Sequence, residues 1–116
     1  MEKGVQAFAV KWREACNSHD LDRILSLYSD TIVFKSPRVR TISGEPAGTL
    51  EGKAAVRDYW RKIFEKRPDL TIVIERVFAG VDSVALEYRI GELRGIEFMT
   101  VSNDGLISFA AGNDLV

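Results

Sequence analysis

One carboxylate in this sequence has surroundings that could change its chemistry. Glu97 interrupts the apolar segment 96–101, where it shares one side of an extended chain with Met99 and Val101. If that side faces the interior, burial raises the pKa of Glu97, and the protonated carboxyl can donate a hydrogen bond or carry a proton. The alternative is a salt bridge that is exposed or lies in an interface.

The strand register decides between these two roles of Glu97. Pairings with residues 84–90 whose numbers sum to an odd value place Glu97 inside, beside Tyr88, and even sums place it on the outer face. The turn 91–95 is too irregular to select one register. The sequence therefore leaves both orientations open.

The other residues capable of chemistry are few. The chain has one histidine, His19, and one cysteine, Cys16, so neither a zinc site nor an intrachain disulfide is expected. His19 stands among capping residues between two predicted helices, which favours capping or exposure over catalysis. Cys16 ends an apolar stripe and is expected to be a small buried hydrophobe. We expect no metal and no cofactor.

Three cations cluster at the end of the first predicted strand and in the loop that follows it. They are Lys35, Arg38 and Arg40. At the mouth of a pocket they would attract an anionic group. The alternative is that they are solvated loop charges.

The composition limits the class of protein. The 116 residues carry 16 Lys and Arg against 17 Asp and Glu, a formal net charge of −1, and 46% are apolar, which fits one globular domain spanning 1–116. Because no positive surplus is available for phosphate backbones, a nucleic-acid partner is not expected. Residues 1–10 contain no long apolar run, so we expect neither a signal peptide nor a membrane partner. We therefore expect a cytoplasmic location.

Periodicity predicts the elements that must position these residues. Apolar residues recur at helical spacing in 5–16, 21–28 and 53–66, and extended patterns occupy 31–36, 70–79, 84–90, 96–101 and 106–111. The segment 37–52 reads as a long surface loop. Three helices interrupted by one strand and followed by an antiparallel meander predict an α+β fold with helices on one face of the sheet.

The hairpin around Val81 and Asp82 predicts two different sheet faces. Pairs summing to 163 place Val77 opposite Leu86, Glu75 opposite Tyr88 and Arg76 opposite Glu87. The face expected against the helices carries Val77, Val84, Leu86, Tyr88 and Ile90, and the outer face carries Ile72, Ile74, Phe78 and the Arg76/Glu87 pair. This half-apolar outer face predicts a homodimer through the convex side of the sheet, with a solvated face as the alternative.

Several phrases of the sequence resemble the SnoaL-like branch of the nuclear transport factor 2-like superfamily. They are Asn17-Ser-His-Asp-Leu-Asp22, Leu27-Tyr-Ser-Asp-Thr-Ile-Val-Phe34 before Ser36-Pro37, Gly48-Thr-Leu-Glu-Gly-Lys-Ala-Ala-Val-Arg-Asp-Tyr-Trp60 and Asn103-Asp-Gly-Leu-Ile107. The resemblance implies a cone-shaped domain in which a strongly curved antiparallel sheet wraps around three helices, as in a cystatin-like roll. It also implies an apolar pocket on the concave side and, in many members, a homodimer on the convex side.

The resemblance also suggests which residues line the pocket. In the steroid isomerases of this superfamily a carboxylate base precedes the proline that ends the first strand; here that position is Ser36, whose hydroxyl cannot accept a proton near neutral pH. The positions of two isomerase tyrosines match Trp12 and Trp60, whose indoles donate hydrogen bonds but do not titrate. Glu97 lies close to the isomerases' second acidic residue. For each Trp the alternative is core packing.

These observations support three hypotheses about function. The first is a protein that binds a small apolar or amphipathic molecule, with Trp12, Ser36, Trp60, Tyr88 and Met99 lining the pocket. The second is an isomerase, polyketide cyclase or dehydratase in which Glu97 is the catalytic proton carrier. The third is a non-catalytic dimerisation module whose interior is filled by its own side chains. The identity of the ligand does not follow from the sequence.

Overall fold

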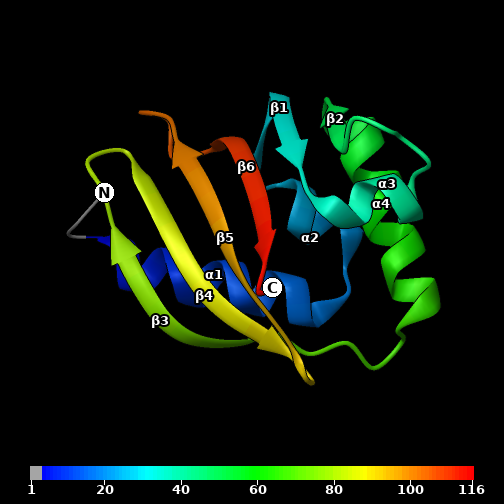
Figure 1. Cartoon of the computed structure of the whole chain (residues 1–116). Helices are drawn as coiled ribbons and strands as arrows, with labels where there is room; N and C mark the ends of the chain where they lie inside the picture. The colour runs from blue at the N-terminus through cyan, green and yellow to red at the C-terminus, as the bar shows by residue number, and fades with distance from the viewer. Residues whose placement is uncertain (1–3) are drawn as a thin grey trace.

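A curved sheet wraps around helices in the computed structural model, which describes residues 4–116 (Figure 1). The elements in chain order are α1 (Val5–Ser18), α2 (Leu21–Leu25), β1 (Tyr28–Lys35), α3 (Pro37–Ile42), β2 (Thr49–Glu51), α4 (Lys53–Lys66), β3 (Val73–Ala79), β4 (Ser83–Ile90), β5 (Leu93–Val101) and β6 (Ile107–Asp114). The predicted α+β class is therefore confirmed.

The sheet has six strands in the order β2-β1-β6-β5-β4-β3. The four-stranded antiparallel meander β3 to β6 is the predicted one. The sequence did not indicate how the first strand joins the sheet: β1 pairs in parallel with β6, and Phe34 stands opposite Ala110. Helix α1 crosses behind the meander, and α4 lies at the β1 and β2 end (Figure 1).

The interpretation of 37–52 as a loop is wrong in part. The Ser36 hydroxyl accepts a hydrogen bond from the backbone N–H of Arg38, and Pro37 occupies the first turn, so that α3 begins where the strand ends. Near the end of this segment, the three residues Thr49–Glu51 form the edge strand β2, which pairs with β1. The second helix is also shorter than predicted, because Tyr28 already belongs to β1 and pairs with Ile107.

A β-bulge corrects the predicted register at the start of β3. The pairs Val77/Leu86 and Arg76/Glu87 are as expected, but the ladder shifts between Ile74 and Arg76, so that Tyr88 faces Ile74 instead of Glu75. Ile74 consequently packs on the inner side with Tyr88. The prediction that Ile72 and Ile74 lie on the outer face is wrong.

Ile72, which precedes the bulge, is held by a side chain of α1. The Asn17 carboxamide accepts a hydrogen bond from Ile72 N–H at 2.7 Å and donates one to Ile72 C=O at 3.0 Å. His19 ends α1 in the left-handed region, its Nε2 lies 2.7 Å from the Leu70 carbonyl oxygen, and its ring stacks on Phe64. The structural role predicted for His19 fits these contacts, which join α1 to the segment leading into β3.

The register between β4 and β5 resolves the orientation of Glu97. Leu86 stands opposite Glu97 and Val84 opposite Met99, so the residue numbers sum to the odd value 183. Because opposite residues point to the same face, Glu97 shares the buried inner face with Leu86 and Val84. The surface and interface alternatives for Glu97 are excluded within this chain.

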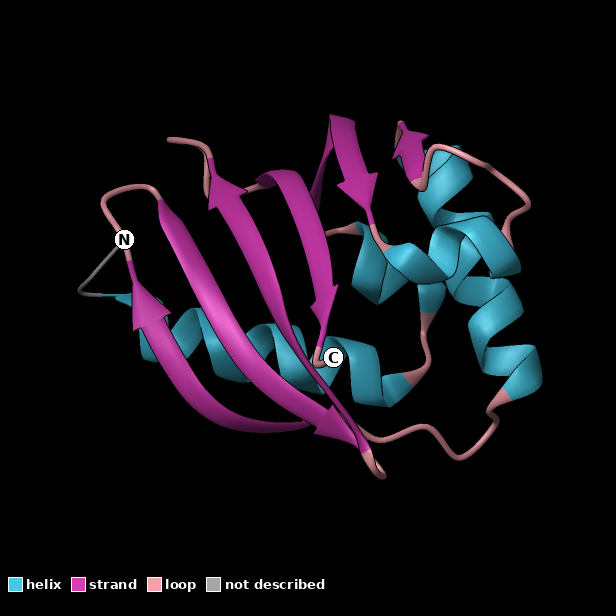
Figure 2. Ribbon diagram, viewed as in Figure 1, coloured by secondary structure: helices cyan, strands magenta, loops and turns pink. Residues whose placement is uncertain are grey.

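Figure 2 shows that no helix within residues 4–116 covers the outer face of β3 to β6. Phe78 is 50% exposed there and Phe98 is 36% exposed, and Phe98 meets Phe109 edge to face. The bidentate Arg76–Glu87 ion pair, with N–O distances of 2.7 and 2.9 Å, lies on the same side. The outer face is thus half apolar, as the alternation in β4 and β5 indicates.

Candidate functional site

A cavity of about 120 Å³ opens between the inner face of the sheet and the helices α1, α3 and α4. Most of its wall is apolar or aromatic, and the polar groups come from α3 and its N-cap Ser36, from the C-terminal half of α4 and its C-cap Arg67, and from β4 and β5. The lining residues are Trp12, Phe34, Ser36, Arg38, Ile42, Tyr59, Trp60, Ile63, Lys66, Arg67, Leu70, Ile72, Tyr88, Ile90, Leu93 and Glu97. An apolar wall with a small polar cluster is typical of a small-molecule site.

The structure brings most of the predicted site residues together. Trp12, Ser36, Trp60 and Tyr88 all line the cavity, as does Glu97. Each Trp projects from the buried stripe of its helix, which also explains why core packing and pocket lining were hard to separate in the sequence.

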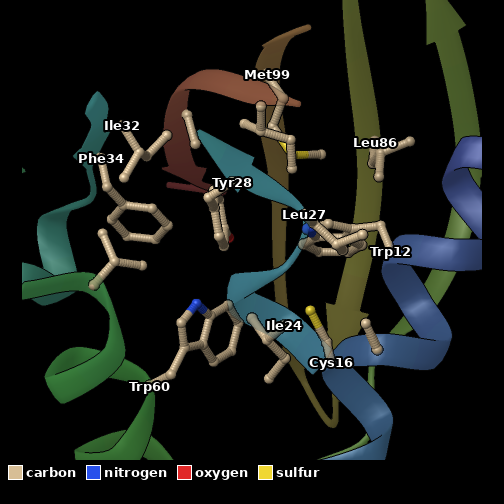
Figure 3. Close-up of a cluster of buried hydrophobic side chains, with 14 of the residues drawn as sticks. Trp12, Cys16, Ile24, Leu27, Tyr28, Ile32, Phe34, Trp60, Leu86 and Met99 are labelled. Atoms are coloured by element: carbon tan, nitrogen blue, oxygen red, sulfur yellow. The ribbon is translucent and has the colours of Figure 1, made fainter. Parts of the chain in front are cut away.

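Met99 does not line the cavity. It lies two residues beyond Glu97 on β5, on the same inner face, and its side chain is fully buried. It belongs to the core cluster that includes Leu86 and Trp12 (Figure 3). Cys16 is also fully buried, as predicted, and burial raises the pKa of its thiol well above the usual value.

Glu97 is the buried carboxyl of the cavity, with 6% of its surface exposed. Burial raises its pKa to about 8, although the nearby Arg38 charge opposes this and Asp114 adds to it. The opposite position on β6 is Gly112, where a Cβ would lie 3.2 Å from Oε1 of Glu97 and 3.3 Å from Oγ of Ser36. The absence of a side chain at Gly112 therefore makes room for both polar groups.

Arg38 joins three elements at the polar end of the cavity. From the first turn of α3, its Nη1 donates to Oδ1 of Asp114 at 2.7 Å, and its Nη2 donates to the Tyr88 hydroxyl at 2.8 Å. Burial alone would lower the pKa of Arg38, but Tyr88, Tyr59 and Asp114 outweigh it and raise the pKa above its usual value. Arg38 is therefore charged. Lys35 and Arg40, which the sequence grouped with it, are exposed and lie outside the lining.

Two tyrosine hydroxyls complete the polar cluster. Tyr59 and Tyr88 are buried, and burial raises the pKa of each phenol while the Arg38 charge partly opposes the rise. Both phenols stay protonated at neutral pH and can donate a hydrogen bond. The sequence placed Tyr59 in the buried stripe of its helix but did not single it out. Its position next to Trp60 was the available signal.

Two indole N–H groups and one tyrosine hydroxyl form a second polar cluster deeper in the core. Among the described residues, the indole N–H groups of Trp12 and Trp60 and the hydroxyl of Tyr28 are buried without a hydrogen-bond partner. Both indole nitrogens face Tyr28 (Figure 3). Burial raises the pKa of Tyr28 well above its usual value, and the two indoles oppose this shift. Donors of this kind are uncommon in cores, because an unsatisfied buried polar group is costly.

Two further observations bear on the kind of site. Within residues 4–116, no cluster of three His, Cys, Asp or Glu side chains could hold a metal ion. In the same part of the chain, no helix is both long and apolar enough to cross a membrane.

The comparisons with known proteins identify the family. The model of the SnoaL-like domain matches residues 9–110. A SnoaL-like protein of unknown function from Burkholderia thailandensis has a similar structure, with 37% identity, a TM-score of 0.93, and coverage of 100% of this chain and 98% of that chain. No protein in the curated set matches the chain.

Two more distant structures share the fold. A nuclear transport factor 2-like protein of unknown function from Cytophaga hutchinsonii is 16% identical, with a TM-score of 0.73 and coverage of 96% of this chain and 89% of that chain. A candidate ketosteroid isomerase from Kribbella flavida is 21% identical, with a TM-score of 0.70 and coverage of 98% and 79%. With the family model spanning most of its length, the chain belongs to the SnoaL-like family.

Proposed function

We propose that this protein binds a small apolar or amphipathic molecule in the cavity. The observation that carries the proposal is the pairing of a mostly apolar wall, including both tryptophans of the chain, with a polar cluster at one end. The volume of about 120 Å³ is close to that of cavities that admit one benzene ring. A ligand with one ring or a short chain fits such a space, and a larger one would extend into the mouth.

Tryptophan emission provides a direct test of binding. Because Trp12 and Trp60 both line the cavity, a ligand should change the emission in a saturable way. An Ile90→Phe variant, which adds atoms inside the lining, should weaken the response. A Val73→Phe variant makes a similar change at an exposed apolar position and is the matched control. Unchanged emission with aromatic, steroid and fatty-chain compounds would favour an interior that serves only packing.

A second candidate is acid–base catalysis by an isomerase, cyclase or dehydratase. The observation that favours it is the buried Glu97, whose pKa of about 8 lets it hold a proton at neutral pH and release that proton at a small cost in free energy. Tyr59, Tyr88 and Arg38 offer donors that would stabilise a developing oxyanion. The fold is shared with a candidate ketosteroid isomerase. If Glu97→Gln left turnover of a discovered substrate unchanged, this assignment of Glu97 would fail.

We also propose that two copies associate through the outer face of β3 to β6. The support is the exposure of Phe78 and Phe98 on a face that no helix of the described part of the chain covers. Light scattering should give twice the chain mass of 13.0 kDa, and Phe98→Asp should shift the mass toward that of one chain. A single-chain mass at micromolar concentration would refute the dimer. A dimer without any ligand response would favour a purely structural module.

A cytoplasmic location is part of the same proposal. It agrees with the free, buried thiol of Cys16, because thiols stay reduced in that compartment. Cell fractionation tests it.

A further inference from the structure

The ionisable side chains that line the cavity carry more positive than negative charge. Among residues 4–116, three cations line it, Arg38, Lys66 and Arg67, against the single carboxylate Glu97. Because burial keeps Glu97 protonated at neutral pH, it does not offset them. The chain as a whole has a formal charge of −1, so this excess of positive charge is local to the cavity.

The counterions present do not cancel this excess. Arg38 has one acidic partner, Asp114, whereas within residues 4–116 neither Lys66 nor Arg67 forms an ion pair. The nearest acids in sequence, Glu65 and Asp69, are exposed and are not part of the lining, and Glu65 pairs with Arg61. The negative end of the α4 dipole accounts for a cation at Lys66, but it does not account for Arg38, which projects from a different helix.

The three cations are placed for two different tasks. Arg38 is 28% exposed and lies at the inner polar end, where charge–charge interactions are screened less than in water. Its hydrogen bonds to Asp114 and Tyr88 use two of its five N–H donors. Lys66 and Arg67 are exposed at the rim, where they can attract an approaching anion without fixing it.

We propose that the ligand of this cavity is an amphipathic organic anion, with its apolar body against Trp12 and Trp60 and its anionic group at Arg38. This inference rests on the proposed function and specifies its ligand class. Lys66 and Arg67 accelerate binding of the anion, and Arg38 holds it. A carboxylate matches the planar guanidinium, which can offer two parallel donors.

Three compounds of nearly equal shape test the inference. Phenylpropanoate, phenylpropanamide and phenylpropylamine share one apolar body and differ in carrying a negative, zero or positive charge. We expect phenylpropanoate to bind about tenfold or more tightly than the amide, from one charge-assisted hydrogen bond, and the amine to bind most weakly. Binding is followed by tryptophan emission at two ionic strengths.

Variants assign the preference to particular cations. Arg38→Gln should lower the affinity for phenylpropanoate about tenfold more than the affinity for phenylpropanamide, and a cooperative urea-unfolding transition shows that the variant is folded. Lys66→Gln combined with Arg67→Gln should lower the association rate of phenylpropanoate and its salt dependence. Arg40→Gln, an exposed change on the same helix as Arg38, is the control and should alter neither.

The possible outcomes separate this inference from the proposed function. If the amide or the amine binds as tightly as the carboxylate, the anionic ligand class is wrong and the binding function stands. If the carboxylate is preferred but neither Arg38→Gln nor the double variant changes the preference, the assignment to these cations is wrong. If none of the three compounds binds, this inference fails, and the proposed function fails with it when steroid and fatty-chain compounds also leave the tryptophan emission unchanged.

Discussion

Replacing Glu97 by Gln should make the protein more stable, by an amount that grows with pH. In the folded protein the pKa of Glu97 is about 8, against an ordinary value of 4.5. Between these two values the native state keeps a proton that the unfolded chain has lost, so the free energy of unfolding falls as pH rises. The two pKa values differ by about 3.5, and at 1.36 kcal/mol per pKa unit the free energy of unfolding falls by about 5 kcal/mol in total.

Below pH 4.5 both states of the wild-type protein carry the proton, and the variant should differ from it by a small constant. Above pH 8 the difference should reach its plateau. Gln cannot ionise, so the difference between the two proteins isolates Glu97 from the other groups. Those that face it are Arg38 on α3, Asp114 on β6, Tyr88 on β4, Tyr59 on α4, Tyr28 on β1 and Cys16 on α1.

Urea unfolding followed by tryptophan emission measures this difference across the pH range. Glu92→Gln, at an exposed position in the turn between β4 and β5, is the matched control and should show no such trend. A difference between wild type and Glu97→Gln that stays constant from pH 4.5 to 8 would refute the claim that Glu97 is buried and neutral in the cavity.

Substitutions at three further positions test the contacts that position the site. Gly112→Ala should cost about 1–3 kcal/mol of stability and weaken ligand binding, because its Cβ presses on Glu97 and Ser36; equal stability and affinity would contradict that packing. Tyr28→Phe should be neutral or stabilising by up to about 1–3 kcal/mol in urea unfolding, because the buried hydroxyl forms no hydrogen bond of standard geometry; a clear loss would show that the two indole N–H groups facing it do satisfy it. Asn17→Ala should cost about 1–3 kcal/mol by losing both hydrogen bonds to Ile72, while Asn17→Asp, which keeps the acceptor, should cost less by the same measurement.

Local patterns were enough to predict much of this fold. The helical stripes of α1 and α4 and the alternation in β4 and β5 each depend on side chains only a few residues apart. The meander followed from the short connections between its strands. The parallel pairing of β1 with β6 joins residues about 75 positions apart in sequence, and no local pattern encodes it.

The errors have specific physical causes. The bulge at Glu75 reverses the faces of Ile72 and Ile74, and the distant Asn17 fixes Ile72 through two hydrogen bonds. The short helix α3 was missed because Ser36-Pro37 is typical both of the end of a strand and of the start of a helix, and only the first was predicted.

The candidate site was predictable where residue type alone marks it. Glu97 was identifiable as a carboxyl in an apolar strand, but its orientation depended on a register that the turn did not reveal. Arg38 could be grouped with its neighbours, yet its selection over Lys35 and Arg40 depends on Tyr88 and Asp114, far away in the chain. Met99 shares the face of Glu97 but belongs to the core cluster, and the alternation along the strand does not separate core from cavity.

The most direct test of the central claim follows the two indole N–H signals in a proton–nitrogen correlation spectrum during a titration with phenylpropanoate. Both tryptophans of the chain line the cavity, so both signals should shift together and saturate at the same ligand concentration. Two signals that stay in place up to the solubility limit of the compound would contradict a ligand-binding cavity between the sheet and the helices.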